Sequence, residues 1–145
     1  RTFFEARAGH IEALALFHAH ARPVCRTDCR ITADPRVARA TRHVLDHLTE
    51  PISTAAVARH VGMRPDSFAR LFRRHTGHSL TGYIHELRIG LACEGLRHGD
   101  EPIAAVAFGA GFGNLAHFNR LFKRLRGCTP RAWRAGQQPS TSPRR

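Results

Sequence analysis

The sequence predicts an all-α protein in which two similar helical units are joined by one long helix. Residues 68–77 read FARLFRRHTG and residues 118–127 read FNRLFKRLRG, so a short segment is nearly repeated fifty residues later. In both copies the apolar residues recur three and four positions apart, which is the spacing of one helical face. No stretch of the sequence alternates between apolar and polar residues as a half-buried strand does.

The size and charge of the chain limit the kinds of protein that it can be. It has 145 residues, of which 42% are hydrophobic, and a formal net charge of +12 at pH 7. We expect one domain or two small ones with a packed core. No apolar run approaches the ~18 residues of a membrane span, and no segment resembles a signal peptide. Because most of the positive charge lies in residues 35–134, the repeat region is expected to bind an anionic partner, nucleic acid first.

The four cysteines are not spaced like a secreted disulfide framework, so reduced thiols and a cytoplasmic location are expected. They are Cys25, Cys29, Cys93 and Cys128. Cys93 lies in a helical pattern and is interpreted as a core residue rather than a redox sensor. The chain begins at Arg1 and its one methionine is Met63, which indicates a piece of a longer protein.

Taken in order, the first elements are an extra N-terminal helix over residues 3–20 and a linker over residues 21–33. We interpret residues 1–33 as the remnant of an upstream sensor or dimerisation region. Asp34 and Pro35 are typical of a helix start, and the helical spacing continues to about Glu50 before Pro51.

A short helix from Ser53 or Thr54 through Val61 and a turn at Gly62 come next. A second helix from Pro65 to about His75 completes a first unit over residues 34–78.

The connecting helix is predicted over residues 79–99, from Ser79 or Thr81 to about Gly99. A second unit, residues 100–134, repeats the order of the first. Its helices run from Pro102 through Ala110, from an Asn114 cap to about Leu125, and from Thr129-Pro130 through Trp133. Residues 135–145 are rich in Gly, Gln, Pro and Ser and are predicted to be a disordered tail.

The duplication extends beyond the ten-residue copies, and each unit reads as a short helix, a glycine turn, a basic helix and a capped aromatic residue. This order is typical of the helix-turn-helix, whose second helix reads DNA. The matched positions are Pro51 with Pro102, Ile52 with Ile103, Val57 with Val106, Gly62 with Gly111, Ser79 with Thr129 and Tyr83 with Trp133.

Side chains facing away from the apolar stripe are the predicted DNA contacts. Arg suits guanine, Asn suits adenine, Asp accepts from cytosine, and Leu or Ala meets a thymine methyl. Predicted base-reading residues are Asp66, Ser67, Ala69, Arg70, Leu115, Ala116, His117, Asn119 and Arg120. Predicted phosphate contacts are Arg73, Arg74, Lys123, Arg124 and Arg126. One copy alone would equally suit a solvated helix face, but two matched copies favour DNA binding.

The apolar stripe itself is predicted to form the cores, and base stacking by its aromatic rings is the rejected alternative. Its residues are Val57, Phe68, Leu71, Phe72, Ile103, Val106, Phe118, Leu121, Phe122 and Trp133.

Residues 34–134 resemble the DNA-binding domain of the AraC/XylS family of bacterial transcription regulators. The resemblance rests on the DPR start, on YIHELRIGLACEGLR and on GAGFGNLAHFNRLFKRLRGCTPRAWR. It implies a homeodomain-like fold of about seven helices that binds double-stranded DNA as an activator or repressor. It also implies RNA polymerase as a partner, and an effector and a homodimer contact through an upstream region. Arg64 departs from the family, which often has a Ser cap there, so the first basic helix is expected to start less firmly. Asp66 and Ala69 occupy exposed reader positions and Ala69 offers only a methyl, so this helix is expected to read fewer bases than the second.

The length of the connecting helix would allow two recognition helices to bind one duplex. About twenty residues at 1.5 Å each span ~30 Å, close to the ~34 Å turn of B-DNA. The two basic helices would then reach successive major grooves of one asymmetric site without a twofold partner.

Two other functions are left open. One is a zinc-cysteine alkylation-repair protein, because His18, His20, Cys25 and Cys29 are soft ligands and CRTDCR resembles a segment of such proteins. We expect no metal and no cofactor there, because the spacing is unusual and a second cysteine pair is missing. The other is a non-specific nucleoid-type DNA binder. No catalytic dyad, triad or phosphate loop is visible in the sequence, so no enzyme activity is predicted.

Overall fold

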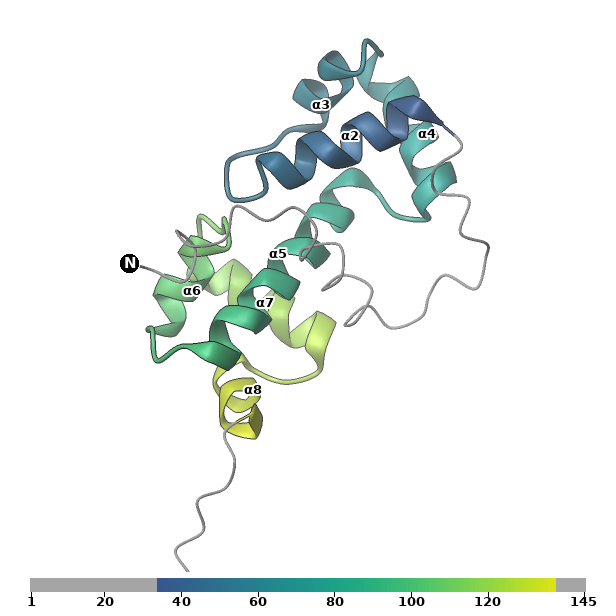
Figure 1. The fold of residues 1–145 in the computed structure, drawn as a ribbon. Helices are drawn as coiled ribbons and strands as arrows, with labels where there is room; N and C mark the ends of the chain where they lie inside the picture. The colour runs from purple at the N-terminus through teal and green to yellow at the C-terminus, as the bar shows by residue number, and fades with distance from the viewer. Residues whose placement is uncertain (1–33, 138–145) are drawn as a thin grey trace, which may run out of the picture.

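A computed structural model describes residues 34–137, which form seven helices and no strand. The all-α prediction is therefore confirmed for these residues. Helices α2 (Pro35–Asp46), α3 (Thr54–His60) and α4 (Pro65–Thr76) form the first unit. Helix α5 (Leu80–His98) leads to the second, which contains α6 (Ile103–Gly109), α7 (Leu115–Arg126) and α8 (Pro130–Gln137). The two units lie toward opposite ends of α5 (Figure 1). The predicted N-terminal helix and linker, residues 1–33, lie outside the described residues.

Five of the predicted helix starts carry a side-chain cap, and those of α4 and α6 do not. In the five, a side-chain oxygen accepts a hydrogen bond from a backbone N–H in the first turn, which satisfies a donor that has no partner within the helix. The capping residues are Asp34, Ser53, Ser79, Asn114 and Thr129. At the first of them the Arg36 side chain also donates to the Asp34 carboxylate, and this hydrogen bond holds the pKa of Asp34 down at about 2.

Two predicted boundaries are wrong. Helix α2 ends at Asp46 rather than near Glu50. Pro51 disfavours a helical conformation at the residue before it, and residues 47–50 close as a turn in which the Glu50 N–H donates to the His47 carbonyl at 2.9 Å. Helix α8 continues through Gln137, so residues 135–137 belong to a helix and not to a tail.

Two apolar cores stabilise the fold, one in each unit, and α5 contributes to both. Tyr83, Ile84 and Leu87 pack into the first core. Further along the same helix Ile89, Cys93 and Leu96 pack into the second core. The predicted core residues lie in these clusters, with Ile103 and Trp133 only partly buried. Cys93 is fully buried and burial raises the pKa of its thiol, which agrees with its interpretation as a core residue.

The repeat is visible in how the aromatic rings pack. Phe72 and Tyr83 meet edge to face with ring centroids 5.4 Å apart. Phe122 and Trp133 meet in the same way at 6.1 Å. An edge-to-face pair places the positive ring edge of one residue on the negative face of the other. Each basic helix is therefore held against its unit by an equivalent aromatic contact.

Among residues 34–137 no helix is both long and apolar enough to cross a bilayer.

Candidate DNA-binding interface

Each unit turns from its first to its second helix through the same backbone motif. The Gly62 N–H donates to the Arg59 carbonyl and the Met63 N–H to the Ala58 carbonyl, at 3.1 and 2.9 Å. In the second unit Gly111 and Phe112 make the equivalent bonds at 3.0 and 3.1 Å. Both glycines have a positive φ, 74° and 93°, as the residue after a helix often does. The two units are therefore helix-turn-helix motifs with α4 and α7 as their second helices.

The turns differ in length by one residue, and so do the caps that follow. Asn114, three residues after Gly111, accepts a hydrogen bond from the His117 N–H at 2.9 Å. Arg64, two residues after Gly62, makes no side-chain cap. The missing side-chain cap expected at Arg64 is confirmed, and the first-turn donors of α4 lack this partner.

Helices α4 and α7 each bury one face and expose the other. Phe68, Leu71 and Phe72 are buried in the first unit, and Phe118, Leu121 and Phe122 in the second. The exposed residues are Asp66, Ala69, Arg70, Arg73 and Arg74 on α4, and Ala116, His117, Asn119, Arg120, Lys123 and Arg124 on α7. Two predicted base-reading residues, Ser67 and Leu115, are half-buried, and Leu115 packs against the second core.

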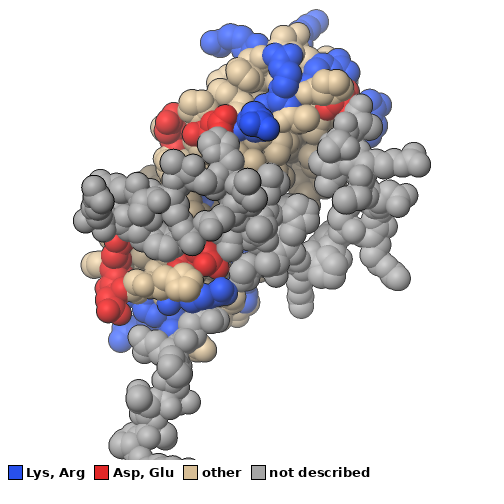
Figure 2. Space-filling view, in the orientation of Figure 1, with Lys and Arg blue, Asp and Glu red and all other residues tan. Residues whose placement is uncertain are grey.

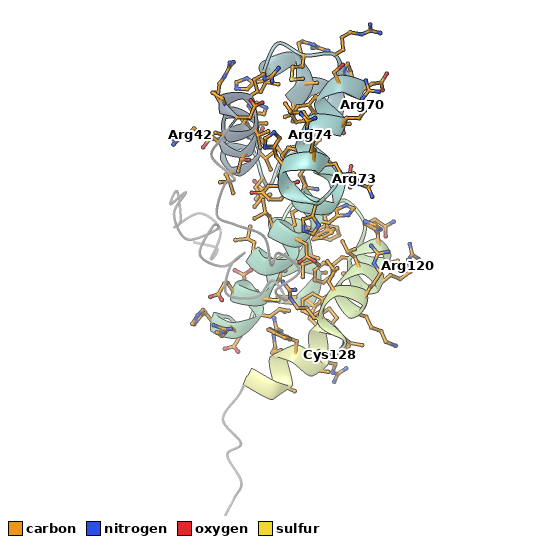
Figure 3. All side chains as sticks on the ribbon, turned by 90° about the vertical axis from the view of Figure 1, so that its right-hand side faces the viewer. Arg42, Arg70, Arg73, Arg74, Arg120 and Cys128 are labelled. Carbon is orange, nitrogen blue, oxygen red and sulfur yellow. The ribbon has the colours of Figure 1, made fainter. Side chains whose placement is uncertain are left out.

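The two exposed basic faces point to the same side of the molecule. In Figure 3, Arg70 and Arg73 from α4 and Arg120 from α7 lie along one side, and Arg42 of α2 lies on the other. Figure 2 shows Lys and Arg side chains gathered at the end of the molecule formed by the first unit. One duplex lying along that side would meet both helices.

A cavity of about 380 Å³ adjoins the basic face of α4. Three guanidinium groups belong to its lining, which is formed by Arg36, Met63, Ser67, Arg70, Leu71 and Arg74. Arg36 is neutralised by Asp34 at 2.9 Å. Arg70 and Arg74 therefore carry the unneutralised positive charge of this lining.

Arg126 does not fit its predicted role as a phosphate contact. Its side chain is only 8% exposed, lies 3.6 Å from the Glu86 carboxylate and donates to the Cys93 Sγ at 3.5 Å. Arg126 follows Phe118 and Phe122 at four-residue steps, so it shares their inward-facing side of α7. The structure assigns it to packing against α5.

His85 of the connecting helix, which is not among the predicted site residues, lies beside the start of α7. Its ring lies 5.3 Å from the His117 ring, and the Phe112 ring lies within 6.4 Å of both. Burial lowers the pKa of His85, and the nearby His117 lowers it further. Because the contact joins α5 to the start of α7, no local pattern in the sequence could have indicated it.

Within residues 34–137 no three His, Cys, Asp or Glu side chains are grouped so that they could hold a metal ion. His18, His20, Cys25 and Cys29 lie outside the described residues.

Known proteins share this arrangement. Residues 57–136 match a family model described as a helix-turn-helix domain. The arabinose operon regulatory protein of Escherichia coli strain K12 is 36% identical over 104 residues, covering 71% of this chain and 36% of that protein. An AraC-type transcriptional regulator from Chromobacterium violaceum is 27% identical in its crystal structure, with a TM-score of 0.67 over 77% of this chain and 97% of that one. The chain belongs to the AraC family.

Two further similar proteins extend the comparison. The transcriptional activator RhaS of Escherichia fergusonii is 33% identical over 107 residues, covering 74% of this chain and 38% of that protein. The DNA-binding domain of AdpA, solved in complex with a target DNA, is 29% identical, with a TM-score of 0.67 over 71% of this chain and 92% of that one. The chain spans little more than a third of the length of these curated relatives. They are named as regulators and not as enzymes.

Proposed function

We propose that this AraC-family chain is the DNA-binding region of a sequence-specific transcription regulator, with α4 and α7 entering successive major grooves of one duplex. The observation that carries the proposal is the pair of exposed basic faces on one side of the molecule (Figure 3). Helix α5 has 19 residues and is therefore ~28 Å long. That length is close to the ~34 Å helical turn that separates successive major grooves on one side of B-DNA.

Bases are read by exposed side chains near the start of each basic helix. On α7, Arg120 suits guanine and Asn119 suits adenine, each through two hydrogen bonds in the major groove. His117 can donate or accept, and Ala116 offers a methyl to thymine. Leu115 divides its surface between the core and solvent, so its contribution to base reading is small.

The first basic helix offers fewer base contacts. Arg70 is aligned with Arg120, and Asp66 can accept from cytosine. Ser67 is half-buried and Ala69 presents only a methyl group. Phosphates are held by Arg73 and Arg74 on α4.

On α7 the phosphate contacts are Lys123 and Arg124, which are exposed one turn beyond the base-reading residues. Such contacts fix the position of a protein on the duplex without reading its sequence.

Regulation requires more than this domain. We propose RNA polymerase as a further partner, and effector binding and dimerisation through a region upstream of the DNA-binding units. No catalytic step is assigned to the chain.

Selection of bound duplexes from a random pool tests the proposed function. The 145-residue chain should enrich one asymmetric site of two parts, with centres about one helical turn apart. Its affinity for that site should exceed that for random DNA by ~10³ or more. Recovery of all sequences alike would support a non-specific DNA binder instead. An Arg42→Ala chain, altered on the opposite side of the molecule, should enrich the same site and serves as the control.

The alkylation-repair alternative receives no support from the described residues. Its candidate ligands lie in residues 18–29, and the curated relatives named above are regulators.

A further inference from the structure

The two helix-turn-helix units meet where the loop between α2 and α3 faces the turn between α6 and α7 (Figure 1). Three features converge there: the backbone of residues 48–50, the Arg88 side chain of α5, and Gly111 in the second turn. Because each unit has a separate core, contacts at this junction bear directly on how one unit is oriented relative to the other.

Arg88 holds the loop of the first unit. Its Nε donates to the Leu48 carbonyl at 2.8 Å, and its Nη2 donates to the Glu50 carbonyl at 2.6 Å. The guanidinium is partly buried, and burial lowers the pKa of Arg88. A planar guanidinium can reach two carbonyls at once in a fixed geometry, whereas an ammonium group is a single point donor. Arg88 therefore fixes the loop in one position on α5.

Gly111 brings the turn of the second unit against that loop. A Cβ atom at this position would lie 2.9 Å from Arg88 Nε, 2.9 Å from Thr49 Cα and 3.0 Å from the Leu48 carbonyl oxygen. Two of these neighbours are backbone atoms of the first unit and cannot rotate away. Any side chain at residue 111 would push the units apart.

Gly62, the equivalent glycine of the first unit, provides a matched control. It has a similar positive φ of 74°, but a Cβ atom there would meet nothing within 4 Å. Substituting either glycine by Ala therefore imposes the same kind of backbone strain, and only the change at residue 111 adds a collision between units.

We propose that this junction sets the angle and spacing between α4 and α7. In it, Arg88 donates hydrogen bonds to the Leu48 and Glu50 carbonyls, and Gly111 packs against the same stretch of backbone. Arg88 and Gly111 are positioning residues that touch no base. On the proposed function, they fix the separation of the two half-sites that one chain can bind at once. The orientation itself is a property of the free protein.

The orientation is tested without DNA by measuring the distance between spin labels on α4 and α7. Labels are placed at two exposed, equivalent positions by Arg73→Cys and Lys123→Cys. The other reactive thiols are removed by Cys25→Ser, Cys29→Ser and Cys128→Ser, and the buried Cys93 stays in place. The parent and Gly62→Ala chains should give one narrow distance distribution. The Gly111→Ala chain should give a shifted or broadened one.

Arg88→Lys is the second variant, because it keeps the charge and adds no bulk. It should broaden the distribution while leaving the helical content by circular dichroism unchanged. Distributions for Arg88→Lys and Gly111→Ala that coincide with the parent would overturn the proposal. A Gly111→Ala chain that fails to fold leaves the decision to Arg88→Lys.

Binding to DNA gives the functional readout. The selected two-part site is compared with duplexes in which one base pair is inserted or deleted between the halves. The parent and Gly62→Ala chains should lose about tenfold or more in affinity at either altered spacing. With one of the two helices α4 and α7 bound to its half-site, the other is then no longer held beside its own. Arg88→Lys should bind the original site more weakly and show a flatter dependence on spacing. An unchanged spacing dependence contradicts the positioning role. If no duplex is preferred at all, the proposed function fails and the spin-label result still decides the orientation.

Discussion

The Arg126 guanidinium lies 3.6 Å from the Glu86 carboxylate and ties the end of α7 to the connecting helix. The two side chains are 8% and 23% exposed, so solvent screens the pair less than it screens a surface ion pair. The hydrogen bond from Arg126 Nε to Cys93 Sγ lies on the same side of α7. This cation therefore stabilises the second unit and is not available to hold DNA.

Substituting Arg126→Ala should lower the free energy of unfolding by ~1–3 kcal/mol, because Glu86 would lose a charged partner in a partly buried setting. The salt dependence of DNA binding should stay unchanged. Urea denaturation and a salt titration of binding measure the two effects. Lys123→Ala is the opposite case: it should change stability by less than ~0.5 kcal/mol and reduce the salt slope by ~0.9. A lower salt slope for Arg126→Ala would return this residue to the DNA contacts.

Arg120→Ala should weaken binding to the selected site by ~1–3 kcal/mol if Arg120 pairs with guanine. The loss should disappear on a duplex in which that one base pair is replaced, because no bidentate contact remains to be lost. Titrations of the parent and the variant on both duplexes measure the effect, with Arg42→Ala as the control for removing a surface cation. Equal losses on every duplex would show that Arg120 binds phosphate rather than a base.

The two basic helices should respond differently to changes at their caps. Asn114→Ala removes the acceptor for the His117 N–H and should cost ~1 kcal/mol in the free energy of unfolding. Arg64→Ser introduces a side-chain acceptor at the start of α4, which has none, and should add ~0.5–1 kcal/mol to the free energy of unfolding. Chemical denaturation of both variants provides the comparison, and a destabilised Arg64→Ser chain would contradict the asymmetry.

Stability should fall in mildly acidic solution because of His85. Burial lowers its pKa below the ordinary value of 6.5, and His117, Arg88 and Arg124 add to the shift. The unfolded chain therefore binds the proton more readily, so the free energy of unfolding should decrease as the pH falls below about 6.5. His43 is shifted in the same direction, chiefly by burial. Urea denaturation between pH 8 and 5 should show this decrease, and His85→Phe should make it smaller; an equally steep decrease in that variant would exclude His85 as a cause.

Local features of the sequence predicted most of the fold. Asn114 is recognisable as a cap because it precedes a helical pattern, whereas Ser53 and Ser79 each share that position with a nearby threonine candidate. The apolar spacing identifies the buried faces of α4 and α7. The ends of helices were less predictable. The turn over residues 47–50 also receives hydrogen bonds from Arg88, which is 38 and 40 residues away from the carbonyls it binds.

The candidate interface, like the fold, was only partly predictable from the sequence. Exposed cations on α4 and α7 follow from helical periodicity, whereas the phosphate role predicted for Arg126 rests on its charge alone. Its place four residues after Phe122 already put it on the inward side of α7. The contacts of His85 with His117 and of Gly111 with the first unit depend on how α5 orients the two units. No periodicity within either unit carries that information.

The most direct test of two reading heads on one duplex is a hydroxyl-radical footprint of the 145-residue chain on its selected site. We predict two protected patches on the same side of the duplex, with centres about 10 base pairs apart. Arg120→Ala should weaken the patch over one half-site before the other. A single protected patch shorter than ~10 base pairs, or protection independent of sequence, would contradict the account.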